Sequence, residues 1–127
     1  MKRNLGVVLS LALLLGLSAG TGRAADQVVL RVVVVETDNV SGYVKEIEKG
    51  KALLKRLESP AILRVWQARF AGRDTGSVVA SAEWPSMAAF AKDEAKTSAD
   101  AEYQAWIKGV AKMRKIVSDS LYSELKP

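Results

Sequence analysis

Four side chains of a predicted β-hairpin carry the groups best suited to a small-molecule site. We expect Trp66 to pair with Ser81 across the hairpin. Arg64 then pairs with Glu83, and all four side chains share one face as a polar patch beside an aromatic ring. Trp66 can stack on a flat ligand or belong to the core or a dimer interface. Arg64 and Glu83 can act as an anion clamp and a base, although a cross-strand ion pair is the simpler interpretation.

Other aromatic side chains offer a second set of candidate pocket residues. Tyr43, Tyr103 and Trp106 lie on helical stripes that we expect to face the sheet, so the core is the leading interpretation for each. Trp84 ends a predicted strand and can simply pack on Phe90 of the following helix. A ligand-contacting role for Trp84, Tyr43 and Trp106 stays open beside these structural roles.

Several catalytic chemistries are excluded because the chain has no cysteine and no histidine. It cannot build the usual zinc sites, a Ser-His or Cys-His nucleophile, or an axial histidine for haem. A carboxylate site for a hard cation would remain, but the acidic residues able to supply it lie among Lys92 and Lys96 on a helical stretch, as on a solvated face. These residues are Asp93, Glu94, Asp100 and Glu102. We therefore expect no metal and no cofactor.

The first two dozen residues have the pattern of a secretory signal peptide. Lys2 and Arg3 precede an apolar run from Leu5 to Leu17, and small residues continue to Ala25. We predict cleavage after Ala24, which gives a signal peptide of residues 1–24 and a periplasmic or secreted protein. An uncleaved membrane anchor is the alternative, although the apolar run is shorter than the roughly 20 residues that span a bilayer.

Cleavage would remove most of the net charge of the chain. The predicted signal holds Lys2, Arg3 and Arg23 and no acid, so 19 basic residues become 16 against 14 acidic ones. We expect no nucleic-acid partner and, after cleavage, no membrane partner, because no concentrated basic face is left. Residues 25–127 suit one domain without a linker or an internal repeat.

The order of the predicted elements indicates a ferredoxin-like fold. A hairpin around the turn 72–76 feeds directly into a helix, with a strand and a helix before it and a helix and a strand after it. This order, βαββαβ, predicts a four-stranded antiparallel sheet with helices on one face, an α+β fold. The valine-rich strand 28–36 and the strand 77–84, which has few charges, should be central, and the polarity of strand 115–125 implies a sheet edge or a wet face.

The predicted helices have three informative positions. The first helix can be capped by Asn39 or Ser41 and should end before Pro60. Gly50 inside it indicates a close approach to the sheet. Cap residues at 97–100 predict that the second helical region is kinked or divided into two helices.

The order βαββαβ and two segments, 83–90 (EWPSMAAF) and 101–106 (AEYQAW), resemble the dimeric α/β-barrel superfamily. This superfamily includes antibiotic-biosynthesis monooxygenases, haem-degrading monooxygenases and NIPSNAP-like proteins, and the resemblance covers essentially all of residues 25–127. It implies a homodimer in which two sheets face each other, with a small-molecule pocket in each protomer between sheet and helices. A sheet face without helices and with few charges favours such a partner on physical grounds as well.

The catalytic residues of the superfamily carry over only in part. Trp84 matches the Trp that ends the third strand in haem-degrading members, and this match makes Trp84 a pocket candidate. Those members also use an Asn on the first strand, where this chain has Val32 to Val35, and a His, which this chain lacks. The resemblance therefore argues against haem degradation. Cofactor-independent members oxidise phenolic polycycles without metal or flavin, which this composition permits.

Three functions follow from these observations. The first is an exported homodimer that binds a small apolar or aromatic molecule between sheet and helices. The second is a cofactor-independent monooxygenase acting on a similar ligand. The third is a structural or interaction protein whose barrel interior is filled and takes no ligand.

Overall fold

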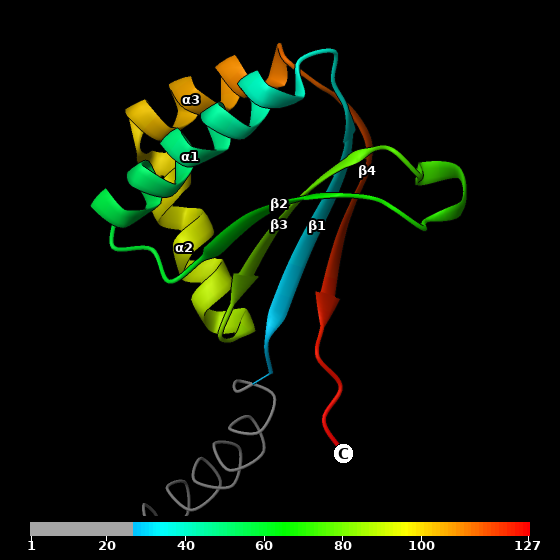
Figure 1. Ribbon diagram of the computed structural model, residues 1–127. Helices are drawn as coiled ribbons and strands as arrows, with labels where there is room; N and C mark the ends of the chain where they lie inside the picture. The colour runs from blue at the N-terminus through cyan, green and yellow to red at the C-terminus, as the bar shows by residue number, and fades with distance from the viewer. Residues whose placement is uncertain (1–26) are drawn as a thin grey trace, which may run out of the picture.

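The computed structural model describes residues 27–127, so the predicted signal peptide lies outside the described residues. A four-stranded antiparallel sheet carries three helices on one face (Figure 1). The strands are β1 (Val29–Glu36), β2 (Ile62–Gln67), β3 (Val78–Trp84) and β4 (Lys115–Ser123). The helices are α1 (Val40–Arg56), α2 (Met87–Ala99) and α3 (Ala101–Ala111), and a short 3-10 helix, η2 (Gly72–Asp74), lies in the hairpin turn. With α2 and α3 as one helical region, this is the predicted βαββαβ order of a ferredoxin-like fold.

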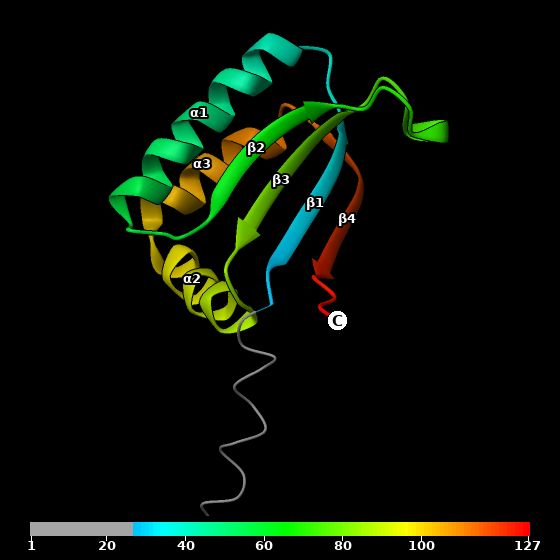
Figure 2. The same cartoon turned by 60° about the horizontal axis from the view of Figure 1, so that its bottom comes forward.

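The strands lie in the order β2-β3-β1-β4, and every neighbouring pair is antiparallel. The predictions that β1 and β3 are central and that β4 is an edge are confirmed. Seen from a second direction, all three helices lie on the same side of the sheet and leave its other side open (Figure 2). In the described part of the chain, none of the helices has the length and apolarity needed to cross a membrane.

The predicted register of the hairpin between β2 and β3 is wrong by two residues. Trp66 lies opposite Val79 and Arg64 lies opposite Ser81, whereas we had expected Trp66 opposite Ser81. The turn sets this register, because Ala68 donates its N–H to the carbonyl of Ser77 at 2.9 Å and so fixes the last pair before the loop. A shift of two residues keeps each side chain on its face, so the predicted grouping on one face survives.

The core lies between the sheet and helix α1. Six buried side chains from β1, α1, β3 and α3 form it: Val33, Val35, Tyr43, Ile47, Val78 and Val110. The buried positions of α1 are Tyr43, Ile47, Gly50 and Leu54, which follow the helical repeat. Val40 and Val44 are apolar positions at helical spacing in α1, yet they are 48% and 38% exposed.

Gly50 approaches another helix and not the sheet, which corrects the expectation from sequence. A side chain at position 50 would collide with the ring of Trp106 on α3. The same indole donates its Nε1–H to the carbonyl of Glu46 at 2.9 Å, one turn earlier in α1. The missing side chain of Gly50 therefore lets α1 and α3 pack closely around one tryptophan.

The helix ends agree with the sequence signals. Asn39 caps α1 by accepting the N–H of Gly42 at 2.9 Å, and the helix ends at Arg56, before Pro60. Asp100 ends α2 and starts α3, because its carboxylate accepts the N–H of Tyr103 at 2.8 Å. The predicted break is thus a division into two helices, which turns α3 across the sheet toward α1.

A candidate ligand site between the sheet and the helices

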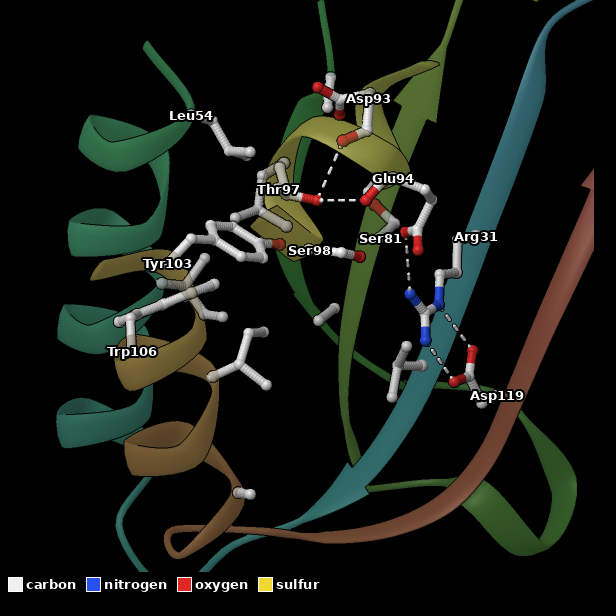
Figure 3. Close-up of a pocket in the computed structure, with 18 of the residues that line it drawn as sticks. Arg31, Leu54, Ser81, Asp93, Glu94, Thr97, Ser98, Tyr103, Trp106 and Asp119 are labelled. Atoms are coloured by element: carbon white, nitrogen blue, oxygen red, sulfur yellow. Dashed lines mark hydrogen bonds and ion pairs between the residues drawn. The ribbon is translucent and has the colours of Figure 1, made fainter. Parts of the chain in front are cut away.

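A cavity of about 430 Å³ lies between the helix-covered face of the sheet and the three helices. Small side chains make room for it, because Ala80 and Ala82 of β3 contribute only methyl groups to its floor. Leu54 of α1 and Tyr103 and Trp106 of α3 line the opposite wall (Figure 3). The interior of the protein is therefore not completely filled by its own side chains.

Aromatic rings form two parts of the cavity wall. The rings of Tyr103 and Trp106 lie with their centroids 5.3 Å apart and line the helix side. Trp84 lies at the end of β3, is 5% exposed and meets Phe90 of α2 edge-on at 4.8 Å between centroids. Rigid aromatic walls suit the face of a flat apolar molecule.

An ion cluster around Arg31 lies on the sheet side of the cavity. The Arg31 guanidinium donates to both carboxylate oxygens of Asp119, with Nε at 2.9 Å and Nη2 at 2.7 Å, and Nη1 lies 3.7 Å from Glu94 (Figure 3). The hydrogen bond from Arg31 is the main reason why the pKa of Asp119 lies below its ordinary value. The cluster joins β1, β4 and α2, and its two carboxylates compensate the charge of Arg31.

A second polar cluster fixes Trp84 on the cavity wall. Asp93 of α2 is 5% exposed, and its Oδ2 accepts hydrogen bonds from Trp84 Nε1 and Ser59 Oγ, each at 2.8 Å. The other oxygen, Oδ1, is buried without a hydrogen-bond partner. These two donors hold the Asp93 carboxylate, which in turn fixes the plane of the Trp84 ring against the cavity.

Tyr103 and Arg114 add hydrogen-bond donors to the lining. Burial, followed by the charge of Glu94, raises the pKa of Tyr103, so its hydroxyl stays protonated near neutral pH. Arg114 follows α3, and its Nη1 donates to the hydroxyl of the fully buried Tyr43 at 3.0 Å. Arg114 Nε is buried and has no hydrogen-bond partner.

Two of the six predicted site residues, Trp84 and Trp106, line the cavity. Tyr43 is 0% exposed and belongs to the core, where its hydroxyl accepts the hydrogen bond from Arg114. Trp106 separates α1 from α3 as well as reaching the cavity, so it has both of the roles considered for it. Ligand contact by any of these residues stays a prediction.

The other three, Trp66, Arg64 and Glu83, lie on the helix-free face and do not line the cavity. Their alternation with cavity-facing neighbours puts them on the opposite side of the sheet. Trp66 Nε1 donates to Ser81 Oγ at 2.7 Å, and Arg64 lies 3.8 Å from Glu83. The arginine and the glutamate thus form a cross-strand ion pair, as the simpler interpretation held, but a diagonal one.

Reasoning from sequence did not select the charged residues that line the cavity as pocket residues, and it weighed Asp93 and Glu94 only as cation ligands on a solvated face. The charged lining residues are Arg31, Asp93, Glu94, Arg114 and Asp119. Arg31 is the only charge inside the valine-rich first strand, and Asp119 lies two residues from both Val117 and Leu121 on the last strand. A charge at an inward-facing strand position implies a partner, so these two could have been paired. Asp93 and Arg114 lie among other charges, and nothing local distinguishes them.

The carboxylates considered as ligands of a hard cation are dispersed. Asp100 and Glu102 both lie beside Arg56, at 2.7 and 3.0 Å from its Nη2. Asp93 and Glu94 are engaged in the two separate clusters described above. Within residues 27–127, no group of three or more His, Cys, Asp or Glu side chains is placed to hold a metal ion.

Comparison with known proteins supports the fold. No protein-family profile and no curated protein sequence matches the chain. A NIPSNAP family protein from Agrobacterium tumefaciens has a TM-score of 0.61 at 16% identity, over 81% of this chain and 88% of that chain. A NIPSNAP-like domain protein from Burkholderia xenovorans has a TM-score of 0.60 at 12% identity, over 81% and 87%.

The same fold occurs in a protein with a known type of activity. SnoaB, a cofactor-independent oxygenase from Streptomyces nogalater, has a TM-score of 0.53 at 17% identity, over 81% of this chain and 97% of that chain. At such low sequence identity, the structural likeness establishes the architecture and does not show the activity. This chain thus has the fold of NIPSNAP and antibiotic-biosynthesis monooxygenase-like proteins.

Proposed function

We propose that this protein binds a small, flat, largely apolar or aromatic molecule in the cavity between sheet and helices. The cavity itself carries this proposal. Its volume of about 430 Å³ lies within the range of roughly 300 to 1,000 Å³ that is usual for small-molecule sites. Aromatic walls and a few fixed polar groups are the lining that such sites generally have.

The cavity argues against a protein whose interior is simply filled. The three-helix layer covers β1 and β3, yet the alanines on β3 leave space above the sheet. This space opens to solvent, so the apolar side chains along it contact water until a ligand covers them. A ligand that occupies the space and stacks on Trp106 or Trp84 supplies the missing contacts.

Binding of naphthalene-2-carboxamide, measured by isothermal titration calorimetry, tests the proposal. Ala82→Phe should fill the cavity and weaken binding at least tenfold, because Ala82 lines the floor. Ala105→Phe adds the same ring to an exposed position of α3 outside the lining and should bind like the wild type. Absence of saturable binding, or equal binding by Ala82→Phe, would contradict a role for the cavity.

The second candidate function is cofactor-independent oxygenation of such a ligand. The fold shared with SnoaB and the position of Trp84 on the cavity wall favour it. For an anthrone, the ring CH₂ carbon would lose two hydrogens and gain one oxygen atom of O₂, and the other oxygen atom would leave as water. The substrate supplies all the electrons, so this chain would need only to bind and orient it.

Oxygen uptake with anthrone distinguishes the two candidates. Turnover predicts consumption of one O₂ per anthraquinone formed, above the uncatalysed rate and reduced by Ala82→Phe. Binding without turnover predicts the uncatalysed rate at every protein concentration. The second result would support the proposal of a binding protein and contradict the proposal of an oxygenase.

We also propose a homodimer formed through the helix-free face of the sheet. That face exposes three large hydrophobic side chains, because Ile62, Trp66 and Tyr122 are 46%, 52% and 55% exposed. Leu30 and Val32 lie between them on the central strand. A symmetric second copy would cover this surface with the same side chains.

Export to the periplasm or the medium is proposed from residues 1–24 alone. The basic start and the apolar run from Leu5 to Leu17 support it. The intact mass of the protein recovered from the periplasm tests this proposal. A chain that begins at Ala25 would agree with it, and a full-length chain in the membrane fraction would contradict it.

A further inference from the structure

We propose that Arg114 binds an anionic group of the ligand, so the natural ligand is an aromatic or apolar carboxylic acid. This inference rests on the proposed function and names the class of molecule for the same cavity. Two arginines line the cavity, Arg31 and Arg114, and they differ in what compensates their charge.

The charge of Arg31 is already compensated within the protein. Two carboxylates face its guanidinium, Asp119 through two hydrogen bonds and Glu94 at 3.7 Å. A ligand carboxylate at Arg31 would have to displace one of them or lie beside both. Since like charges repel at such distances, the Arg31 end of the cavity disfavours an anion.

Arg114 has no carboxylate partner within ion-pair distance among the described residues. Its one hydrogen bond goes to the hydroxyl of Tyr43, and its Nε is buried without a partner. The charge of Arg114 contributes to the lowered pKa of Asp119, but the Asp119 carboxylate is hydrogen-bonded to Arg31. A partly buried guanidinium without a direct ion pair is stabilised when an anion joins it.

Tyr103 offers a second hydrogen-bond donor in the same cavity. Its raised pKa keeps its hydroxyl protonated, and this hydroxyl makes no hydrogen bond to any residue in the described part of the chain. The charges of Glu94 and Asp93 act on Tyr103 more strongly than those of Arg31 and Arg114, so this donor belongs to the end of the cavity that holds the carboxylates. A protonated hydroxyl there can donate to a polar atom of the ligand, while Arg114 is the group suited to its anion.

The unpaired acceptor of the cavity lies far from Arg114. Asp93 Oδ1 belongs to the Trp84 cluster, and Trp84 pairs with Val29 at the start of β1. Arg114 follows Met113, whose carbonyl accepts the hydroxyl of Thr37 just beyond the end of β1. The length of β1, about 20 Å for six residues of separation, thus divides the two ends.

The test compares naphthalene-2-carboxylate with naphthalene-2-carboxamide, which have nearly the same shape. On the wild-type protein, calorimetry should show at least tenfold tighter binding of the carboxylate, equivalent to about 1.4 kcal/mol. Arg114→Gln should abolish this preference while the carboxamide still binds, because a glutamine amide can still donate to Tyr43. Arg114→Lys should keep most of the preference, and Arg69→Gln, in the exposed hairpin turn, should leave it unchanged.

The possible outcomes separate this inference from the proposed function. If the carboxamide binds as tightly as the carboxylate, the ligand is not selected as an anion, while the cavity still binds aromatic molecules. If the preference persists in Arg114→Gln, another group binds the anion and the assignment to Arg114 is overturned. If neither probe binds the wild-type protein, the proposed function fails together with the inference.

Discussion

The two faces of one sheet differ in how the protein uses them. On the helix-covered face, inward-pointing Val33, Val35 and Val78 pack into the core, and the charges of Arg31 and Asp119 are paired beside a cavity. On the helix-free face, half-exposed Trp66 and neighbouring hydrophobic side chains lie open. Because alternate residues of the same strands supply both faces, one set of strands can present a small-molecule site and a protein interface.

The largest expected effect concerns the helix-free face. Trp66→Glu should convert a dimer to a monomer in size-exclusion chromatography with light scattering, because it places a charge in the proposed interface. Phe70→Glu is the matched control, since Phe70 is completely exposed in the hairpin turn. A wild-type monomer, or an equal effect of both substitutions, would show that this face has no such partner.

The next effect concerns the helix-covered face. Asp93→Ala leaves the indole N–H of Trp84 and the hydroxyl of Ser59 without their acceptor. Each buried donor left unpaired costs about 1 to 3 kcal/mol, so urea unfolding should show a loss of roughly 2 kcal/mol or more. Asp93→Asn keeps one acceptor oxygen and should cost less. Equal losses for the two substitutions would mean that the hydrogen bonds contribute little and that Asp93 acts by packing alone.

A smaller effect is expected from substitutions that change how closely α1 and α3 pack above that face. Gly50→Ala should destabilise the fold by about 1 kcal/mol, since its methyl group would displace the Trp106 ring and overpacking outweighs the better helix propensity. Gly109→Ala has open space around the added methyl group and should be stabilising by up to about 1 kcal/mol. Thermal unfolding of the two variants measures the contrast, and stabilisation by both would mean that α1 and α3 are not in close contact.

The smallest effect is a pH dependence from the Arg31 cluster. Because Arg31 lowers the pKa of Asp119 below 3.8, the ion pair stabilises the fold fully above that pH and is lost as the pH falls through the folded-state value. Asp119→Asn should therefore lower the urea midpoint at pH 5 and have less effect at pH 2.5. The same decrease at both pH values would assign the effect to packing or hydrogen bonding and not to ionisation.

The fold was predictable because each element carries its own local signal. The valine run of β1, the cap at Asn39 and the break at Asp100 depend only on nearby residues, and the structure confirms all three. The hairpin register was not predictable to the residue, because a turn that contains a 3-10 helix and two glycines with positive φ sets it.

The site was harder to predict because its residues meet only after folding. Trp66 and Arg64 share a face with Glu83, as expected, but the sequence alone did not decide whether that face lies toward the helices. Arg114 becomes notable only in the folded chain, where its hydrogen bond goes to Tyr43, 71 positions away in sequence, and not to a carboxylate. Charge compensation is a property of the folded arrangement and leaves no local pattern.

Native mass spectrometry of the wild-type protein with naphthalene-2-carboxamide tests the central claim, that the two faces have different partners. We expect a dimer that takes up one probe molecule per chain, and Trp66→Glu should give a monomer. A wild-type monomer that takes up no probe would contradict the proposed role of each face.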